Sequence, residues 1–271
     1  MTSPLVLQAA YDAVPAVNWS ALKYMRESPL EYRYRLTHRD DKPAWVLGRA
    51  THAALYEPDV FADHYVVYPG PVRRGKAWDA FKAEHDGDEI LTAAERTEAA
   101  MIADAVRSNP NAARYIDGGY VEQRITWTDA ITGLACKGRT DEVNGRVIDL
   151  KTTRNIDARR FAADVARFGY HCQAAFYQDG LEANGVTGLD SPVLIAVQNQ
   201  APYDVAVYEL PDVVVEQGRA EYRRLLEQVL RCTEHNEWPG VAPDTVQLTL
   251  PAWAVEEEDD VMPTAGGAPM F

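Results

Sequence analysis

The sequence predicts an α/β or α+β fold in which helices flank a central mixed β-sheet. Helical patterns fill the first part of the chain, a hairpin-rich group of strands follows, and a helix, two strands and a long helix complete the order. Strands and helices that alternate strictly from the start would instead predict a doubly wound sheet. The grouping of the strands therefore favours a mixed sheet.

Helix signals mark the first part of the chain. Asn18 and Ser20 precede an apolar-periodic run, and Asn or Ser at that place is a helix N-cap signal. Thr92 begins a later helix in the same way, and Asn109-Pro110 is expected to end it. The elements predicted here are, in chain order, a helix at 21–26, a short helix from Ser28-Pro29, a helix at 45–57 that stops at Pro58, a strand at 64–70, and helices at 77–85 and 92–107.

Strand signals begin after residue 115. Residues 119–127, 133–139 and 145–150 are expected to be three successive strands, with turns at Asp129-Ala130 and Asn144-Gly145. Asn-Gly between apolar runs is the strongest short signal for a hairpin. The remaining predicted elements are a helix at 158–183, strands at 192–198 and 203–209, and a helix at 211–236.

The length of 271 residues is ample for a large core. We expect residues 1–14 to be an extended lead-in and residues 15–253 to form a single domain. Within that domain, residues 15–115 form a helical part and residues 116–236 form the core. Residues 254–271 are acidic and then rich in Pro and Gly, so we expect a disordered, solubilising tail.

The net charge of −14 argues against nonspecific binding of nucleic acid by the whole surface. The charge is uneven, however, because acidic residues crowd 256–260 while Arg and Lys gather at 23–49 and 73–82. A local basic channel on an acidic protein can still bind DNA.

The three cysteines, Cys136, Cys172 and Cys232, are widely spaced and form no CxxC pair. Without a disulfide framework, the chain suits a reducing compartment and buried thiols. Residues 1–10 lack the basic start and apolar stretch of a secretory signal. No apolar run reaches the roughly 18 residues of a membrane span. We therefore expect a cytoplasmic protein.

The segment 140–151 carries the residues that point to a chemistry. Asp149 and Lys151 are two positions apart on a predicted strand, so their side chains project to the same face. Asp141 precedes the Asn144-Gly145 turn and can reach the same place. Two neighbouring carboxylates favour Mg²⁺ or Mn²⁺, and a lysine beside them can orient or deprotonate a water or stabilise phosphate charge. The alternative is an exposed hairpin with an Asp–Lys pair on its solvent-facing side.

Four motifs, taken in order, resemble the RecB-like branch of the PD-(D/E)XK nuclease superfamily. They are Gly48-x-x-x-His52, Gly138-Arg139-Thr140-Asp141, Asp149-x-Lys151 within Val147–Thr153, and Gln173-x-x-x-Tyr177. Their joint occurrence is far more specific than any one motif. The resemblance implies a restriction-endonuclease-like core and metal-dependent hydrolysis of DNA.

Finer details resemble the RecE group, which comprises exodeoxyribonuclease VIII and related phage and prophage recombination exonucleases. They lie in Asn18–Lys23, Arg73–Phe81 and Tyr170–Gly180, and the whole resemblance spans residues 15–235. It implies Mg²⁺-dependent degradation of linear double-stranded DNA in the 5′-to-3′ direction, with Mn²⁺ as a substitute. It also implies a single-strand annealing partner, a ring-like trimer or tetramer, and a bacterial host cell.

The resemblance implies a role for each site residue. The expected catalytic residues are Asp141, Asp149, Lys151 and Glu122. The expected metal ligands are His52, Asp141, Asp149 and the backbone carbonyl of Leu150. The residues expected to contact DNA are Gln173, Tyr177, Arg73, Arg74, Lys76, Trp78 and Thr152. Open alternatives are a surface carboxylate for Glu122, a packing role for His52 and a solvated loop for the basic segment.

Two other functions stay open. One is a DNA endonuclease of repair, which would cut closed circular DNA as well as linear DNA. The other is a non-catalytic module that uses the fold to bind DNA or a protein. An iron–sulfur cluster is not expected, because three cysteines cannot supply its four thiolates.

Overall fold

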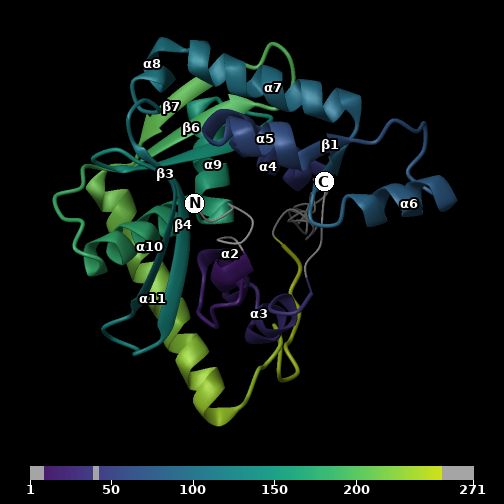
Figure 1. The fold of residues 1–271 in the computed structure, drawn as a ribbon. Coiled ribbons are helices and arrows are strands. Elements are labelled where there is room, and N and C mark those ends of the chain that lie inside the picture. The colour runs from purple at the N-terminus through teal and green to yellow at the C-terminus, as the bar shows by residue number, and fades with distance from the viewer. Residues whose placement is uncertain (1–8, 39–42, 252–271) are drawn as a thin grey trace, which may run out of the picture.

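The protein is described by a computed structural model that covers residues 9–38 and 43–251 (Figure 1). Its centre is a five-stranded sheet in the order β3-β4-β5-β6-β7. The strands are β3 Tyr120–Thr128, β4 Ala135–Val143, β5 Val147–Thr153, β6 Val193–Gln198 and β7 Val205–Glu209. The pair β5–β6 is parallel and the other pairs are antiparallel. The predicted mixed sheet is therefore confirmed.

Helices cover both faces of the sheet (Figure 1). On one face lie α4 Pro43–Tyr56, α7 Ala93–Ser108 and α8 Pro110–Ala113, and their apolar side chains pack against Ile148 and Leu150. On the other face lie α10 Tyr170–Ala183 and α11 Asp212–His235, which pack with Val147. The apolar residues of β6, buried on both faces, form a continuous run because the strand is covered on two sides.

Predicted caps begin several helices. Asn18 caps α2 Trp19–Leu22, which continues into the 3₁₀ helix η1 Lys23–Arg26. Ser28 caps α3 Pro29–Arg35, and Thr92 forms a capping box with Glu95 at the start of α7. Side-chain oxygens at these positions accept hydrogen bonds from backbone N–H groups that have no partner within the helix.

A small outlying part separates α4 from α7. It contains α5 Pro58–His64, β1 Tyr65–Val67, α6 Lys76–Glu84 and β2 Glu89–Leu91. The short strands β1 and β2 pair in parallel as a separate two-stranded sheet. The sequence predicted neither β2, α5 nor α8, and the strand predicted at 64–70 ends at Val67.

The helix predicted at 158–183 is two helices, α9 Ala158–Phe168 and α10. Gly169 separates them with a φ of +70°, a left-handed conformation that suits glycine. A Cβ at Gly169 would lie 2.5 Å from the indole ring of Trp19, so the close approach of α2 also requires glycine here.

The N-terminal lead-in also differs from the prediction. Residues 9–12 are helical rather than extended. The ammonium of Lys137 on β4 donates hydrogen bonds to the carbonyls of Tyr11, Asp12 and Val14 at 2.8–3.0 Å. The predicted tail over 254–271 lies outside the described residues. Within those that are described, no helix combines the length and apolar character needed to cross a membrane.

Candidate metal centre

The predicted site lies where β4 and β5 diverge. The two strands pair at Val143↔Val147 and Glu142↔Ile148, next to the hairpin turn. One step further, Oδ2 of Asp141 accepts a hydrogen bond from the backbone N–H of Leu150 at 2.8 Å. A carboxylate thus stands between the strands, in place of a backbone bond. Both strands run further than predicted, so that Asp141 and Lys151 lie within them.

Asp149 and Lys151 form an ion pair on the face of β5 opposite Ile148 and Leu150. Lys151 Nζ lies 2.6 Å from Oδ2 of Asp149. The same ammonium donates to Oε1 of Gln173 at 2.9 Å and lies 4.4 Å from the ring centroid of Tyr170. The first turn of α10 therefore fixes the lysine from one side, and Asp149 fixes it from the other.

Gln173 and Tyr177 are joined to each other as their i,i+4 spacing predicts. Nε2 of Gln173 donates to the hydroxyl of Tyr177 at 3.2 Å. Gly138 on β4 makes room for the Tyr177 ring, because a Cβ at Gly138 would lie 3.0 Å from that ring. The motif on α10 is thus linked through Gln173 to Lys151 and packed against β4.

His52 reaches the divergence of the strands from α4. Its Nδ1 lies 3.3 Å from Oδ2 of Asp141, and its Nε2 lies 3.1 Å from the carbonyl oxygen of Leu150. Both ring nitrogens face oxygen acceptors, so the contacts are satisfied together only by the protonated imidazolium. In that form the ring would place a positive charge between a carboxylate and a carbonyl that were both predicted to bind the metal.

Glu122 lies opposite Asp141 in the register of β3 and β4, between the pairs Val121↔Glu142 and Gln123↔Thr140. Its φ of +50° is left-handed and costs energy for a residue that is not glycine. Its carboxylate is buried and pairs with Nε of Arg139 at 2.9 Å. His52, Glu122 and Asp141 each place a ligand atom within 4.8 Å of the others.

Burial and charge spread the pKa values of this group. Burial raises the pKa of Glu122 to about 7 and that of Asp149 to about 6, although Arg139 and Lys151 respectively oppose the shift. Burial also acts on Asp141, but the charge and hydrogen bond of His52 outweigh it and lower the pKa of Asp141. For His52, burial disfavours the charged form, and the carboxylates led by Asp141 nevertheless raise its pKa. Carboxyl groups with pKa values pushed apart are typical of functional sites.

These donors fit a hard divalent cation. Carboxylate and carbonyl oxygens are the ligands that Mg²⁺ and Mn²⁺ prefer, and a neutral imidazole suits Mn²⁺. The His52 ring, in contact with Asp141 and the Leu150 carbonyl, marks a place where these oxygens converge on one group. Asp141, Glu122, His52 and the Leu150 carbonyl can hold the ion together, with Asp149 beside them on β5.

The basic segment predicted to contact DNA lies apart from this group. Arg73 pairs with Glu95 at 2.7 Å, and Trp78 packs edge-on against Tyr68 at a centroid distance of 5.0 Å. Arg74 and Lys76 are exposed. Figure 1 shows α6, which follows this loop, at the edge of the molecule away from β4 and β5.

Thr152, also predicted to contact DNA, lies beside α4. A Cβ at Gly48 would lie 3.5 Å from its hydroxyl oxygen, so the Gly48 turn of α4 runs close to β5. The same helix brings His52 within reach of the Leu150 carbonyl.

Two residues of the site were not predicted as such. Arg139 pairs with Glu122, and Tyr170 lies over the Lys151 ammonium. Their spacing from predicted site residues could have identified both as members of the site. Arg139 precedes Asp141 by two residues on a strand and so shares its face, and Tyr170 precedes Gln173 by three residues on a helix.

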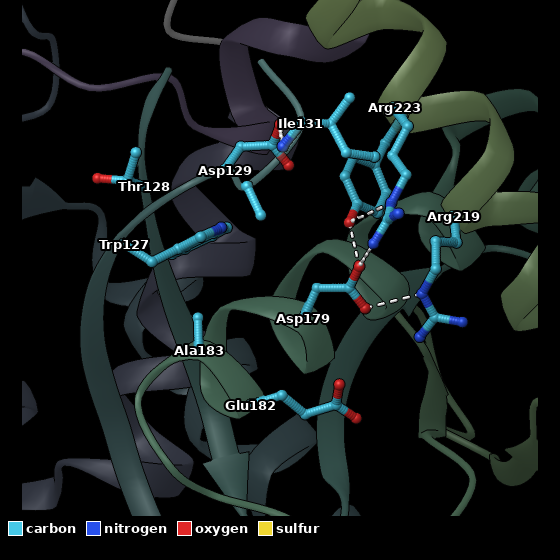
Figure 2. A pocket seen from close by; sticks show the side chains of 11 residues that line it. Trp127, Thr128, Asp129, Ile131, Asp179, Glu182, Ala183, Arg219 and Arg223 are labelled. Carbon is cyan, nitrogen blue, oxygen red and sulfur yellow. Dashed lines mark hydrogen bonds and ion pairs between the residues drawn. The ribbon is translucent and has the colours of Figure 1, made fainter. Parts of the chain in front are cut away.

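A separate pocket of about 280 Å³ lies between the end of β3, α10 and α11 (Figure 2). Asp179 lies at its centre and binds Arg219 and Arg223, each at 2.8 Å, and the hydroxyl of Tyr222. The described lining includes none of the predicted catalytic residues. The pairing of Asp179 on α10 with two arginines of α11 favours a structural link between these helices.

The mixed sheet, the acidic residues at the divergence of two strands, the lysine and the helix with Gln173 and Tyr177 together define the PDDEXK-like class. The chain belongs to the family described as "PDDEXK-like domain of unknown function (DUF3799)", whose model matches residues 18–246. The predicted membership of the PD-(D/E)XK superfamily and the predicted fold class are thereby confirmed.

A solved structure with a similar fold supports this architecture. A crystal structure of a candidate exonuclease from Eubacterium rectale matches with a TM-score of 0.59 at 16% identity, covering 88% of this chain and 87% of that chain. A second structure, of SSO0001, covers 76% of this chain and 84% of its own at 14% identity, with a TM-score of only 0.28. No curated protein matches the chain.

Proposed function

We propose that the protein is a metal-dependent exonuclease that degrades linear double-stranded DNA. The observation that carries the proposal is the group at the divergence of β4 and β5. There, Asp141 accepts a hydrogen bond from the Leu150 N–H, His52 contacts the Leu150 carbonyl, and Lys151 is held beside Asp149. The family and the fold of the Eubacterium rectale protein support a nuclease.

Asp141, Asp149, Glu122, His52 and the Leu150 carbonyl are the residues that would hold one or two Mg²⁺ ions. When bound, the metal supplies a water of lowered pKa and stabilises charge on the phosphate. Ion binding requires the His52 ring to leave at least one of its two present contacts, because its nitrogens face the same oxygens.

Lys151 acts in this proposal through its charge. Burial disfavours the ammonium, but Asp149 and the other neighbours raise the pKa of Lys151 above its ordinary value. A lysine that stays protonated orients the attacking water and stabilises the phosphate rather than removing a proton. Gln173 positions this ammonium through a bond of 2.9 Å.

The direction of degradation and the partners are further parts of the proposal. The motifs shared with the RecE group support a 5′-to-3′ direction, a role in phage-type recombination with a single-strand annealing protein, and a ring-like trimer or tetramer. Basic side chains in the 73–76 loop support contacts with the phosphates of a duplex end.

The test compares linear duplex DNA, labelled at either its 5′ or its 3′ end, with covalently closed circular DNA in the presence of Mg²⁺. An exonuclease with the proposed polarity releases the 5′ label first and leaves the circle intact. Cleavage of the circle would instead support an endonuclease of repair. Binding of duplex without cleavage under Mg²⁺ or Mn²⁺ would support the non-catalytic module.

A further inference from the structure

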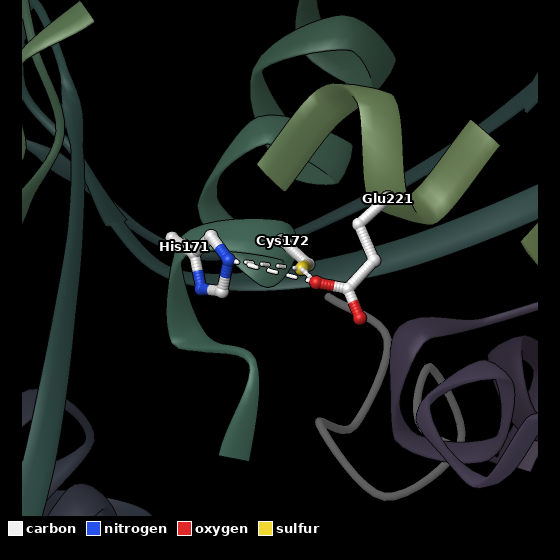
Figure 3. A group of neighbouring side chains, drawn as sticks. All are labelled: His171, Cys172 and Glu221. Atoms are coloured by element: carbon white, nitrogen blue, oxygen red, sulfur yellow. Dashed lines mark hydrogen bonds and ion pairs between the residues drawn. The ribbon is translucent and has the colours of Figure 1, made fainter. Parts of the chain in front are cut away.

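A second group of ligand-type side chains lies where the N-terminus of α10 meets α11 (Figure 3). His171 and Cys172 come from α10 and Glu221 from α11, and their ligand atoms all lie within 4.8 Å of one another. The group uses a thiol, an imidazole and a carboxylate, whereas the centre at β4 and β5 uses mainly oxygens. None of its three residues is used in the proposed nuclease mechanism.

The three atoms form a nearly equilateral triangle. Sγ of Cys172 lies 3.6 Å from Nε2 of His171 and 3.3 Å from Oε2 of Glu221, and these last two atoms are 3.7 Å apart. Tetrahedral Zn²⁺ with ordinary bond lengths to sulfur, nitrogen and oxygen separates such ligands by roughly 3.4–3.6 Å. The triangle therefore matches one face of a zinc tetrahedron within about 0.3 Å.

The surroundings orient each ligand. Nδ1 of His171 lies 3.3 Å from the carbonyl oxygen of Val165, which places the ring proton there and leaves the lone pair of Nε2 facing the group. Arg26 pairs with the other oxygen of Glu221, Oε1, at 2.8 Å. That contact leaves Oε2 as the oxygen available to an ion.

The packing of the two helices brings the ligands together. A Cβ at Gly218, one turn before Glu221, would lie 2.4 Å from the carbonyl oxygen of His171. The glycine allows the backbones to approach closely. Cys172 is fully buried, whereas the side chains of His171 and Glu221 keep 12% and 25% of their exposure. A water can therefore reach the fourth position of an ion from the side of His171 and Glu221.

We propose that His171, Cys172 and Glu221 bind one Zn²⁺ ion that joins α10 to α11, with a water as the fourth ligand. The thiol proton of Cys172, now donated to Glu221, leaves to solvent on binding. The thiolate and the carboxylate then offer two negative charges to the ion, and no oxidant or reductant takes part. A thiolate ligand favours Zn²⁺ over Mg²⁺, so the two cations have separate sites. This proposal does not depend on the nuclease activity.

Cobalt titration of the untagged, full-length protein tests this site, after dialysis against a chelator. Co²⁺ bound to a thiolate gives a sulfur-to-cobalt charge-transfer absorption, which carboxylate binding at Asp141 cannot give. We expect the band to rise to one equivalent per chain and Zn²⁺ to abolish it. A folded wild-type protein that shows no band at saturating Co²⁺ would overturn the proposal.

Variants assign the band to its residues. Cys172→Ser should remove it, whereas Cys232→Ser, on the same helix pair but outside the group, and Asp141→Asn should keep it. If Cys172→Ser fails to fold, Glu221→Gln and His171→Asn should still weaken Co²⁺ binding at least about tenfold. Circular dichroism checks that each variant is folded. A band that survives in folded Cys172→Ser, or unchanged affinity in both other variants, would contradict the assignment.

Discussion

The two groups of side chains beside the first turns of α10 differ in ligand type and in electrostatics. At β4 and β5, the carboxylates of Asp141, Asp149 and Glu122 crowd together, and their pKa values are shifted in opposite directions. Beside α11, one carboxylate meets a thiol and an imidazole, and Arg26 already compensates its charge. Oxygen-rich sites of the first kind suit hard cations, and thiolate-containing sites of the second kind select Zn²⁺. The same helix thus contributes to two sites that can be tested independently.

The largest expected effect is the loss of cleavage in Lys151→Ala and Asp149→Ala. Either change removes one member of the ion pair beside the metal ligands, and we expect the rate on linear duplex under Mg²⁺ to fall at least about a hundredfold. Gel assays of linear duplex measure the rate. Arg224→Ala, an exposed basic residue on α11, is the control and should keep full activity. Full activity in either site variant would remove the nuclease assignment.

His52→Ala should weaken the binding of Mg²⁺ without abolishing cleavage. The histidine contacts both Asp141 and the Leu150 carbonyl, so its loss should raise the Mg²⁺ concentration for half-maximal cleavage about 10- to 100-fold. His64→Ala is the control, because His64 pairs with Asp88 in the outlying part of the fold. An unchanged Mg²⁺ dependence would assign His52 to helix packing alone.

The stability of the metal-free protein should fall as pH rises from about 4.5 to above 7. Glu122 and Asp149 have raised pKa values in the fold, so the folded state holds protons there that the unfolded state has lost. The raised pKa of His52 acts in the same direction. Asp141, with a lowered pKa, acts in the opposite direction only below its ordinary value of 3.8. We expect Tm to drop by roughly 5–10 °C across this window.

The Glu142→Gln variant and the addition of Mg²⁺ distinguish which carboxyl groups cause this pH dependence of Tm. Glu142 is fully buried on the opposite face of β4, and burial raises its pKa to about 7 as well. Glu142→Gln should flatten part of the Tm profile with or without Mg²⁺. Saturating Mg²⁺ should flatten the part that belongs to Glu122 and Asp149. A profile that rises with pH in the metal-free protein would show that these carboxyl groups are not protonated in the fold.

The smallest expected effect is at the basic loop. Arg74→Ala should weaken duplex binding modestly and reduce the slope of log affinity against log salt by about 1, as for one phosphate contact. Arg114→Ala, whose guanidinium lies over the Tyr115 ring, is the control. An unchanged salt slope, measured by fluorescence anisotropy with a labelled duplex in Ca²⁺, would leave the loop as a solvated surface.

The sequence was most informative where the signal is local. Caps at Asn18, Ser28 and Thr92 and the hairpin at Asn144-Gly145 depend on neighbouring residues, and the structure has all of them. The alternation of side chains along a strand was enough to predict that Asp149 and Lys151 share one face of the sheet. The i,i+4 contact of Gln173 with Tyr177 followed from helix geometry in the same way.

Features that depend on distant packing were missed. The helix breaks at Gly169, where the ring of Trp19 from another helix leaves no room for a Cβ. A glycine within an apolar-periodic run does not by itself predict a helix break. The β1–β2 pairing joins three-residue strands across 24 residues, too short for a clear strand pattern. The left-handed Glu122 could not be predicted, because its conformation depends on the register of β3 against β4.

The three carbonyls bound by Lys137 have a consequence for where the folded unit begins. Lys137 is only 5% exposed, and the chain at Tyr11, Asp12 and Val14 supplies its acceptors. Cutting the protein at residue 15, where the domain was predicted to start, or at residue 18, where the family match starts, would leave a buried ammonium without those acceptors. Hydrogen bonds to a charged group are each worth about 1.5–3 kcal/mol, so the loss of these three would remove a sizeable part of a typical folding free energy. The smallest stable fragment should therefore begin upstream of Tyr11.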